Sequence, residues 1–324
     1  MAPDGQVARV TFPAVGTEVL LEVVAPDPKR VVAACRDVIL HLEARLSRFR
    51  LDSDVSRLNR VLGEWVEVGP HTAAVLEAAA SAWAATGGLF DATAGGGFCG
   101  LTTDGTGRWR VRTGFAVDLG GIAKGYIADK VRDVARAAGA TSALVSLGSS
   151  SVAVLGERPG GGPWRVGLRA PGHDREAAYG VVELAPGASL STSGLDEAPG
   201  HLVDPRTGLE VRGEGAQALA VTVVVGPDVP GAGMVAEAWS TALMIGGPEA
   251  LTRHYARQAP APWEAVMVTG AAVMVTPLLA KGHFSGTKGQ FRQLVIPALS
   301  RSLSVCAGQR LEIPGQARDD QKVG

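Results

Sequence analysis

The sequence predicts an α+β fold in which helices pack against mixed or antiparallel sheets. Segments rich in β-branched residues outnumber segments with helical spacing, and the two kinds do not alternate strictly along the chain. No repeat of fixed period is visible. The chain has 324 residues, of which 46% are hydrophobic and 19% charged, so it is long enough to bury a sizeable core.

The first third of the chain predicts strands and helices in turn. The strand segments carry β-branched residues or alternate in polarity, and the helical segments carry apolar residues three or four positions apart. The expected strands are 8–12, 16–24 and 64–68, and the expected helices are 29–49, 53–59 and 71–86.

The rest of the chain predicts two helices among many strands. An apolar run ends at Asp118, and the turn through Gly120 and Gly121 leads into a helix. The hydroxyl-rich segment 189–194 is expected to be a loop. The expected helices are 122–138 and 234–247, and the expected strands are 142–147, 151–156, 164–169, 179–184, 216–226, 264–268 and 272–276.

The C-terminal segment differs from the rest in composition. From Lys281 onward no hydrophobic period is sustained and helix and strand breakers are frequent. We therefore expect a catalytic domain over residues 1–280 and an irregular or disordered tail over 281–324.

Charge and composition exclude several classes of protein. The formal net charge is −1 without a basic patch, which argues against nucleic-acid binding. Cys35, Cys99 and Cys306 are far apart and odd in number, so we expect free thiols. The sequence shows no secretory signal, lipid-anchor cysteine or apolar stretch that could span a bilayer, which leads us to expect a cytoplasmic protein.

Two segments carry residues suited to phosphate or proton chemistry. In VDLGGIAKGYIAD (117–129), a glycine turn opens a helix and Lys124 follows, which can hold a phosphate or can simply be a turn. In GHLVDPRTG (200–208), His201 precedes an Asp-Pro turn and is either a general base or a solvated histidine.

A third segment carries oxygen ligands on a helix. Glu237 and Thr241 lie four positions apart, so their side chains share one helix face. A carboxylate and a hydroxyl suit Mg²⁺ better than Zn²⁺, although an intrahelical hydrogen bond explains the same pair.

The order of the motifs is more specific than any one of them. Eight segments follow one another along the chain: AVGTEV, LSRFRLDSDVSRLN, TGGLFDATAG, VDLGGIAKGYIAD, LVSLGSSSVAVLG, LSTSG, HLVDPRTG and AEAWSTALMIGG. This series resembles the bacterial FAD:protein FMN transferases, the ApbE family, over residues 8–278. The resemblance implies the flavin-transferase (ApbE-like) fold.

The resemblance also implies a reaction. Members of the family split the pyrophosphate of FAD, transfer FMN to a threonine or serine hydroxyl of an acceptor flavoprotein, and release AMP with the help of Mg²⁺. The alternatives are an FAD pyrophosphatase that gives FMN and AMP, and a non-catalytic FAD-binding protein.

The resemblance assigns roles to individual residues. His201 is the implied base, and Ala123, through its backbone carbonyl, joins Glu237 and Thr241 as a metal ligand. Asp204 and Thr207 are expected to shape their loop within the cofactor site. The implied cofactor-binding residues are Val15, Phe49, Phe90, Asp91, Asp118, Gly120, Gly121, Lys124, Ser193, Gly194, Asp204 and Thr207.

The sequence departs from the family pattern at three places. Glu237 stands where the family has Asp, and the longer side chain changes the reach of a metal ligand. Val15 replaces the usual Met before Gly-Thr. Ser146 and Ser149 replace the Asn and one Gly of an Asn-x-Gly-Gly block.

Overall fold

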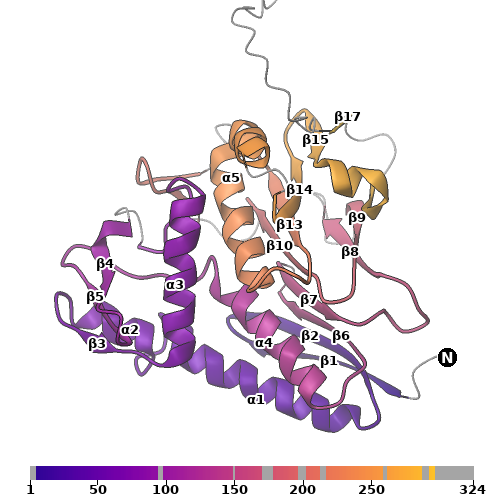
Figure 1. Ribbon diagram of the computed structural model, residues 1–324, viewed down its shortest axis with the longest axis horizontal. Coiled ribbons are helices and arrows are strands. Elements are labelled where there is room, and N and C mark those ends of the chain that lie inside the picture. Colours follow the sequence, from indigo (N-terminus) through magenta and orange to yellow (C-terminus); the bar gives the residue numbers. More distant parts are fainter. Residues whose placement is uncertain are drawn as a thin grey trace, which may run out of the picture.

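A long twisted sheet runs through the centre of the molecule, with helices along one face (Figure 1). The computed structural model describes residues 5–93, 98–148, 150–169, 178–195, 202–211, 217–257, 261–286 and 292–295. The prediction of an α+β fold with mostly antiparallel strands is confirmed.

Nine strands of the described chain form the central sheet, in the order β1-β2-β6-β7-β10-β13-β14-β15-β17. Among these described strands, neighbours run antiparallel except β15 and β17, which run parallel. The strands are β1 (Gln6–Ala14), β2 (Thr17–Ala25), β6 (Ser142–Leu147), β7 (Ser151–Leu155), β10 (Ser189–Gly194), β13 (Ala220–Val225), β14 (Trp263–Val268), β15 (Ala272–Val275) and β17 (Arg292–Val295).

The two faces of the sheet are covered differently. Helices α1 (Pro28–Leu46), α4 (Ala123–Ala137) and α5 (Ala232–Arg257) pack on one face, with α4 over β6 and β7 and α5 over β10 and β13. Because side chains alternate along a strand, Val221 and Val223 pack into the helix-side core, whereas Val152 and Val154 pack into the core on the other face.

The outer helices extend the helix layer. Helix α3 (Pro70–Ala85) packs against α5, and α2 (Asp54–Arg60) contacts α1 (Figure 1). Ser53 caps α2 by accepting a hydrogen bond from the Ser56 amide at 2.9 Å.

Three small sheets complete the fold. The first is β3 (Val66–Glu67), β5 (Arg108–Val111) and β4 (Leu101–Thr103), and the second is β16 (Phe284–Gly286), β9 (Ala178–Leu184) and β8 (Trp164–Arg169). The third is a hairpin of β11 (Val203–Asp204) and β12 (Leu209–Glu210). The second small sheet covers the face of the central sheet that the helices leave open.

Helices α4 and α5 cross at two glycines. A Cβ added to Gly125 would lie 2.1 Å from the Gly233 carbonyl oxygen, and one added to Gly233 would lie 2.3 Å from the Gly125 oxygen. Only residues without a Cβ permit this approach. Asp129 of α4 fixes the crossing, because it accepts hydrogen bonds from the Gly233 amide at 2.8 Å and from Ser189 Oγ at 2.7 Å.

Two expectations from the sequence are wrong. Residues 189–194 are not a loop but strand β10, because Ser189, Ser191 and Ser193 alternate toward polar groups on the helices. Residues 284–286 and 292–295 are strands paired with β9 and β15, so the irregular tail does not begin at 281. Residues 296–324 lie outside the described part of the chain.

Helix α5 is longer than the sequence predicts. It continues to Arg257 through a kink at Gly247, whose φ of 63° interrupts the helix before Pro248. Both residues are poor in helix interiors, which explains why the pattern predicts an end there. In the part of the chain that the structure describes, no helix has the length and apolar character needed to cross a membrane.

Candidate active site

A polar cavity of about 430 Å³ lies where α4, α5 and β10 meet, and it is called the site cavity below. Its walls come from segments that are distant in the sequence: the ends of α1 and α3, the turn before α4, β10, the β11–β12 hairpin and α5. The lining residues are Arg48, Phe49, Leu89, Phe90, Asp91, Asp118, Gly120, Gly121, Lys124, Ser150, Ser191, Thr192, Ser193, Leu202, Val203, Pro205, Glu237, Thr241 and Ile245.

The glycine turn before α4 presents bare backbone to the cavity. The Gly120 amide donates to Asp118 Oδ1 at 2.9 Å, which holds the turn in shape. A Cβ on Gly121 would lie 3.2 Å from a Phe90 ring carbon and 3.6 Å from Thr241 Oγ1. A side chain at Gly121 would therefore press against Phe90, which is buried, at the entrance to helix α4.

A buried ion pair lies beside this turn. Glu237 is 3% exposed, and Lys124 Nζ lies 2.7 Å from its Oε1 atom. The Gly125 amide donates to Oε2 of the same carboxylate. The buried charge of Glu237 is thus matched by one ammonium group and by an amide in the first turn of α4, as burial of a carboxylate requires.

Hydroxyl groups line the wall formed by α5 and β10. Ser193 Oγ lies 2.9 Å from Ser240 Oγ and 3.5 Å from Thr241 Oγ1. Thr241 is one helical turn beyond Glu237, so both side chains line the cavity. The described side chains contain no group of three or more His, Cys, Asp or Glu placed to hold a metal ion.

Two further carboxylates line the cavity. Asp91 Oδ1 accepts hydrogen bonds from the Thr93 amide at 2.7 Å and from Thr93 Oγ1 at 2.5 Å. Its Oδ2 atom is buried and has no hydrogen-bond partner among the described residues. Asp118 Oδ2 lies 3.4 Å from Arg48 Nε, an arrangement that positions Arg48 at the cavity wall.

The structure brings most of the predicted site residues together. Those that line the site cavity are Phe49, Phe90, Asp91, Asp118, Gly120, Gly121, Lys124, Ser193, Glu237 and Thr241. His201, the predicted base, lies outside the described residues, as does Ser149. Their predicted roles stay predictions.

Five predicted residues are not among those that line the cavity. They are Val15, Ala123, Gly194, Asp204 and Thr207. Ala123 is the first residue of α4, next to Lys124. Val15 lies in the tight turn between β1 and β2 with a φ of 49°, unusual for a β-branched residue. No observation tests the cofactor or metal roles predicted for these five.

Asp204 and Thr207 shape the β11–β12 turn. Asp204 accepts hydrogen bonds from the Arg206 amide and guanidinium, and its backbone oxygen accepts one from the Gly208 amide at 2.8 Å. The Arg206 guanidinium lowers the pKa of the Asp204 carboxyl group. Val203 and Pro205, the two neighbours of Asp204 in the chain, lie at the cavity wall.

Comparison with known proteins assigns this arrangement to a family. The model of the ApbE family matches residues 15–100 and 97–267, most of the described fold and all of the residues that line the cavity. The chain belongs to the ApbE family.

Relatives with curated names carry one activity. A Klebsiella pneumoniae (strain 342) protein named FAD:protein FMN transferase is 39% identical over 109 residues, 31% of this chain and 32% of that protein. An Escherichia coli (strain K12) protein of the same name is 34% identical over 143 residues, 41% of this chain and 37% of that protein. The aligned region therefore spans about a third of the length of these relatives.

Solved structures of the ApbE family share the fold over most of the chain. The ApbE protein of Thermotoga maritima superposes with a TM-score of 0.75 at 24% identity, covering 86% of this chain and 99% of that one. The flavinyl transferase ApbE of Pseudomonas stutzeri, in its apo form, gives a TM-score of 0.73 at 25% identity, with coverage of 87% and 98%.

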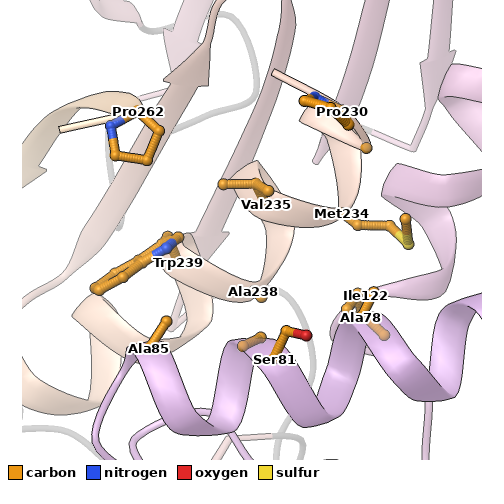
Figure 2. Close-up of a pocket in the computed structure, with 12 residues that line it drawn as sticks. Ala78, Ser81, Ala85, Ile122, Pro230, Met234, Val235, Ala238, Trp239 and Pro262 are labelled. Atoms are coloured by element: carbon orange, nitrogen blue, oxygen red, sulfur yellow. The ribbon is translucent and has the colours of Figure 1, made fainter.

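A second pocket, on another side of α5, is lined mostly by apolar side chains. It is a groove of about 480 Å³ between α3 and α5, and Figure 2 shows Met234, Val235 and Trp239 of α5 facing Ala78 and Ser81 of α3. The Ser81 hydroxyl already donates to the Glu77 backbone oxygen. The site cavity, with its carboxylates, hydroxyls and lysine, is thus the candidate active site of this ApbE-family chain.

Several cavity residues were missed from the sequence. They are Arg48, Leu89, Ser150, Ser191, Thr192, Leu202, Val203, Pro205 and Ile245. Each of these except Ser150 lies one to four positions from a predicted site residue. The alternation of Ser189, Ser191 and Ser193 was the signal for a strand that presents Ser191 and Ser193 on one face.

Proposed function

We propose that this chain is an Mg²⁺-dependent FAD:protein FMN transferase, which transfers FMN from FAD to a threonine or serine hydroxyl of an acceptor flavoprotein and releases AMP. The observation that carries the proposal is the pairing of Lys124 with Glu237 beside the bare backbone of Gly121, inside the site cavity. The names of the curated relatives support the same activity.

The glycine turn and Lys124 are proposed to bind the pyrophosphate of FAD. Backbone without a Cβ lets phosphate oxygens approach closely, and the N-terminus of α4 favours negative charge. Lys124 adds a positive charge, and with Arg48 it makes this wall of the cavity suited to an anion. Phe90 and Phe49 provide aromatic surface at the same cavity for the flavin or adenine ring.

The residues present fit a magnesium ion. Glu237 and Thr241 offer a carboxylate and a hydroxyl from one face of α5, and Mg²⁺ commonly combines one or two protein oxygens with substrate phosphates. We propose that Glu237 and Thr241, with the backbone carbonyl of Ala123, hold the ion. Bound there, it would supply neutralisation of charge on the phosphates.

The transfer is a displacement at phosphorus. The acceptor hydroxyl oxygen forms a bond to the phosphorus of the FMN half, and the bond from that phosphorus to the bridging oxygen breaks. The bridging oxygen leaves with AMP, and the hydroxyl proton passes to a base. We propose His201 as this base, since it precedes the hairpin whose Val203 and Pro205 line the cavity.

The experiment that tests the proposal is a product analysis. The purified chain is incubated with FAD, MgCl₂ and a threonine-bearing acceptor fragment, and products are identified by mass spectrometry. We expect an FMN adduct on the acceptor and an equal amount of AMP, both lost in Glu237→Ala. The matched control is Glu77→Ala, which removes an exposed carboxylate on α3.

The other outcomes identify the alternatives. AMP and free FMN without an adduct, with each acceptor tried, would indicate the FAD pyrophosphatase. Bound FAD without either product in the presence of Mg²⁺ would indicate a flavin-binding protein without catalysis.

A further inference from the structure

A smaller pocket adjoins the site cavity and carries a different set of side chains. It encloses about 260 Å³ and is called the arginine pocket, after Arg206, Arg253 and Arg257 in its lining. Leu89 lines both cavities, so the two are neighbours. No role in the proposed transfer uses these arginines.

The arginines of this pocket come from two elements that are distant in the sequence. Arg206 comes from the turn of the β11–β12 hairpin. Arg253 and Arg257 come from α5 beyond its kink at Gly247, four positions apart and so on one helix face. The pocket therefore lies between the hairpin and the end of α5.

The positive charge in this pocket is only partly compensated. Arg206 is paired with Asp204 of its own hairpin at 2.7 Å, and Arg253 is paired with Glu249. Arg257 makes no ion pair or hydrogen bond with any residue of the described chain. Within the described residues, no carboxylate is therefore paired with the Arg257 guanidinium, a group that binds oxyanions well.

The positive charge of the pocket also affects the pKa of His254. It lies in the lining of the pocket, 8% exposed, with its ring packed edge-on against Trp239. Burial lowers the pKa of His254, and the charges of Arg253 and Arg257 lower it further. An anion between these groups would oppose the second effect.

Arg206 of the hairpin makes no ion pair to α5 within the described residues. The ion pair and side-chain hydrogen bonds of Arg206 are made to Asp204, two positions away in the same turn. Glu249 of α5 lies close enough to Arg206 to raise its pKa, which places the two elements within electrostatic reach. A small anion could therefore contact both.

We propose that the arginine pocket binds an oxyanion, a carboxylate or a phosphate group, which bridges Arg206 to Arg253 and Arg257 and fixes the hairpin against α5. Guanidinium groups bind both kinds of oxyanion, often through two parallel hydrogen bonds. Because Val203 and Pro205 of the hairpin line the site cavity, the bound anion also fixes one wall of that cavity.

The test is a titration of the full chain followed by NMR of the His254 side chain, without any flavin. Inorganic phosphate and acetate are used in separate titrations. We expect the pKa of His254 to rise to a plateau as the anion is added. We expect the concentration at half-saturation to increase at least tenfold in the double variant Arg253→Gln/Arg257→Gln.

Two further variants complete the design. Arg206→Gln, which changes a half-exposed side chain, is expected to weaken binding as well and keeps the test valid should the double variant not fold. Arg165→Gln removes a comparable arginine paired with Glu183 on the β8–β9 sheet and is expected to leave binding unchanged. Hydrogen exchange of residues 203–210 is expected to slow several-fold with the bound anion.

The outcomes separate the sources of the anion. If only phosphate raises the pKa of His254, the natural ligand is a phosphorylated small molecule. If acetate raises it as well, the carboxylate of an acidic side chain is also a ligand for the pocket. The proposal would be overturned if neither anion raised the pKa of His254 to a plateau, or if the arginine variants bound the anion as the wild type does. It would also be overturned if the anion left the hydrogen exchange of residues 203–210 unchanged. None of these results depends on the transferase activity.

Discussion

The ammonium group of Lys124 lies 2.7 Å from the buried carboxylate of Glu237, and the two residues come from helices that cross at Gly125 and Gly233. The sequence suggests separate tasks for them, one toward phosphate and one toward a metal ion. In the structure they form one charged group at the cavity wall. The first two predictions concern the contribution of this ion pair to the stability of the fold and the binding of a divalent cation at Glu237.

Removal of the ammonium should destabilise the fold. In Lys124→Met, the carboxylate of Glu237 stays buried and keeps only the hydrogen bond from the Gly125 amide among the described residues. Loss of one partner from a largely buried ion pair costs about 2–4 kcal/mol in the free energy of unfolding. Urea unfolding measures the loss. The control Lys130→Met removes an ammonium over the Tyr126 ring and should cost less than about 1 kcal/mol. Equal effects in the two variants would contradict this interpretation.

Divalent cations should bind at Glu237 and Thr241. Titration of the free chain with Mn²⁺, followed by electron paramagnetic resonance, measures this binding without FAD. We expect Glu237→Gln and Thr241→Val each to weaken it about tenfold or more, because each removes an oxygen ligand. Thr252→Val is the matched control, since Thr252 lies on the same helix and donates to the Pro248 oxygen. Chelation should also stop the release of AMP. Unchanged Mn²⁺ binding in both site variants would refute this assignment.

A side chain at the helix crossing should be poorly tolerated. In Gly125→Ala, the new Cβ would lie 2.1 Å from the Gly233 oxygen, so α4 and α5 must separate. We expect a loss of about 2–4 kcal/mol in the free energy of unfolding. We also expect weaker Mn²⁺ binding, because the Ala123 carbonyl of α4 would move away from Glu237 and Thr241 of α5, the other two proposed ligands. In the control Gly167→Ala, the nearest atom lies 4.0 Å from the new Cβ, and the change should stay below about 1 kcal/mol. A fully stable Gly125→Ala protein would mean that the helices do not cross as described.

His254 should make the fold less stable in mild acid. Its pKa is lowered in the folded chain, first by burial and then by Arg253 and Arg257. Between that pKa and its value of about 6.5 in the unfolded chain, the unfolded state binds more protons, so stability falls as the pH falls through this window. Thermal unfolding between about pH 7 and 5 should show a weaker pH dependence in His254→Asn than in the wild type. His283→Asn, which changes an exposed histidine, serves as control. An identical pH dependence in wild type and His254→Asn would count against this role.

Much of the fold could be predicted because local patterns and tertiary packing agree. Helix α1 buries Val31, Cys35, Ile39 and Leu42 at helical spacing, as its sequence predicts. Cys35 is a free thiol, as expected, and its burial raises the pKa of the thiol to about 12. Strand β13 is buried over almost its whole length, as its continuous apolar run predicts.

The errors have a common physical cause. Strand β10 is rich in serine, and serine-rich segments usually form loops. Here Ser189 donates to Asp129, and Ser193 contacts Ser240, so the strand is stabilised by polar partners on α4 and α5 that no local pattern reveals. The short strands β16 and β17 likewise depend on pairing with β9 and β15.

The sequence predicts the site residues that belong to recognisable motifs. It does not predict those that reach the site only through contacts between distant segments. Phe90, Gly121 and Thr241 belong to three separate motifs, and in the structure all three line one cavity. Arg48 was missed because its position depends on a contact with Asp118 that joins distant segments. The arginine pocket depends on the kink at Gly247 and on the hairpin turn, and neither is visible as a charge pattern in the sequence.

The most direct test of the central claim is a crystal structure of the full chain with bound FAD. We predict that the pyrophosphate of FAD lies in the site cavity, against the backbone of Gly120 and Gly121 and within contact of Lys124. A pyrophosphate bound instead in the arginine pocket, or FAD bound in the apolar groove between α3 and α5, would contradict the account.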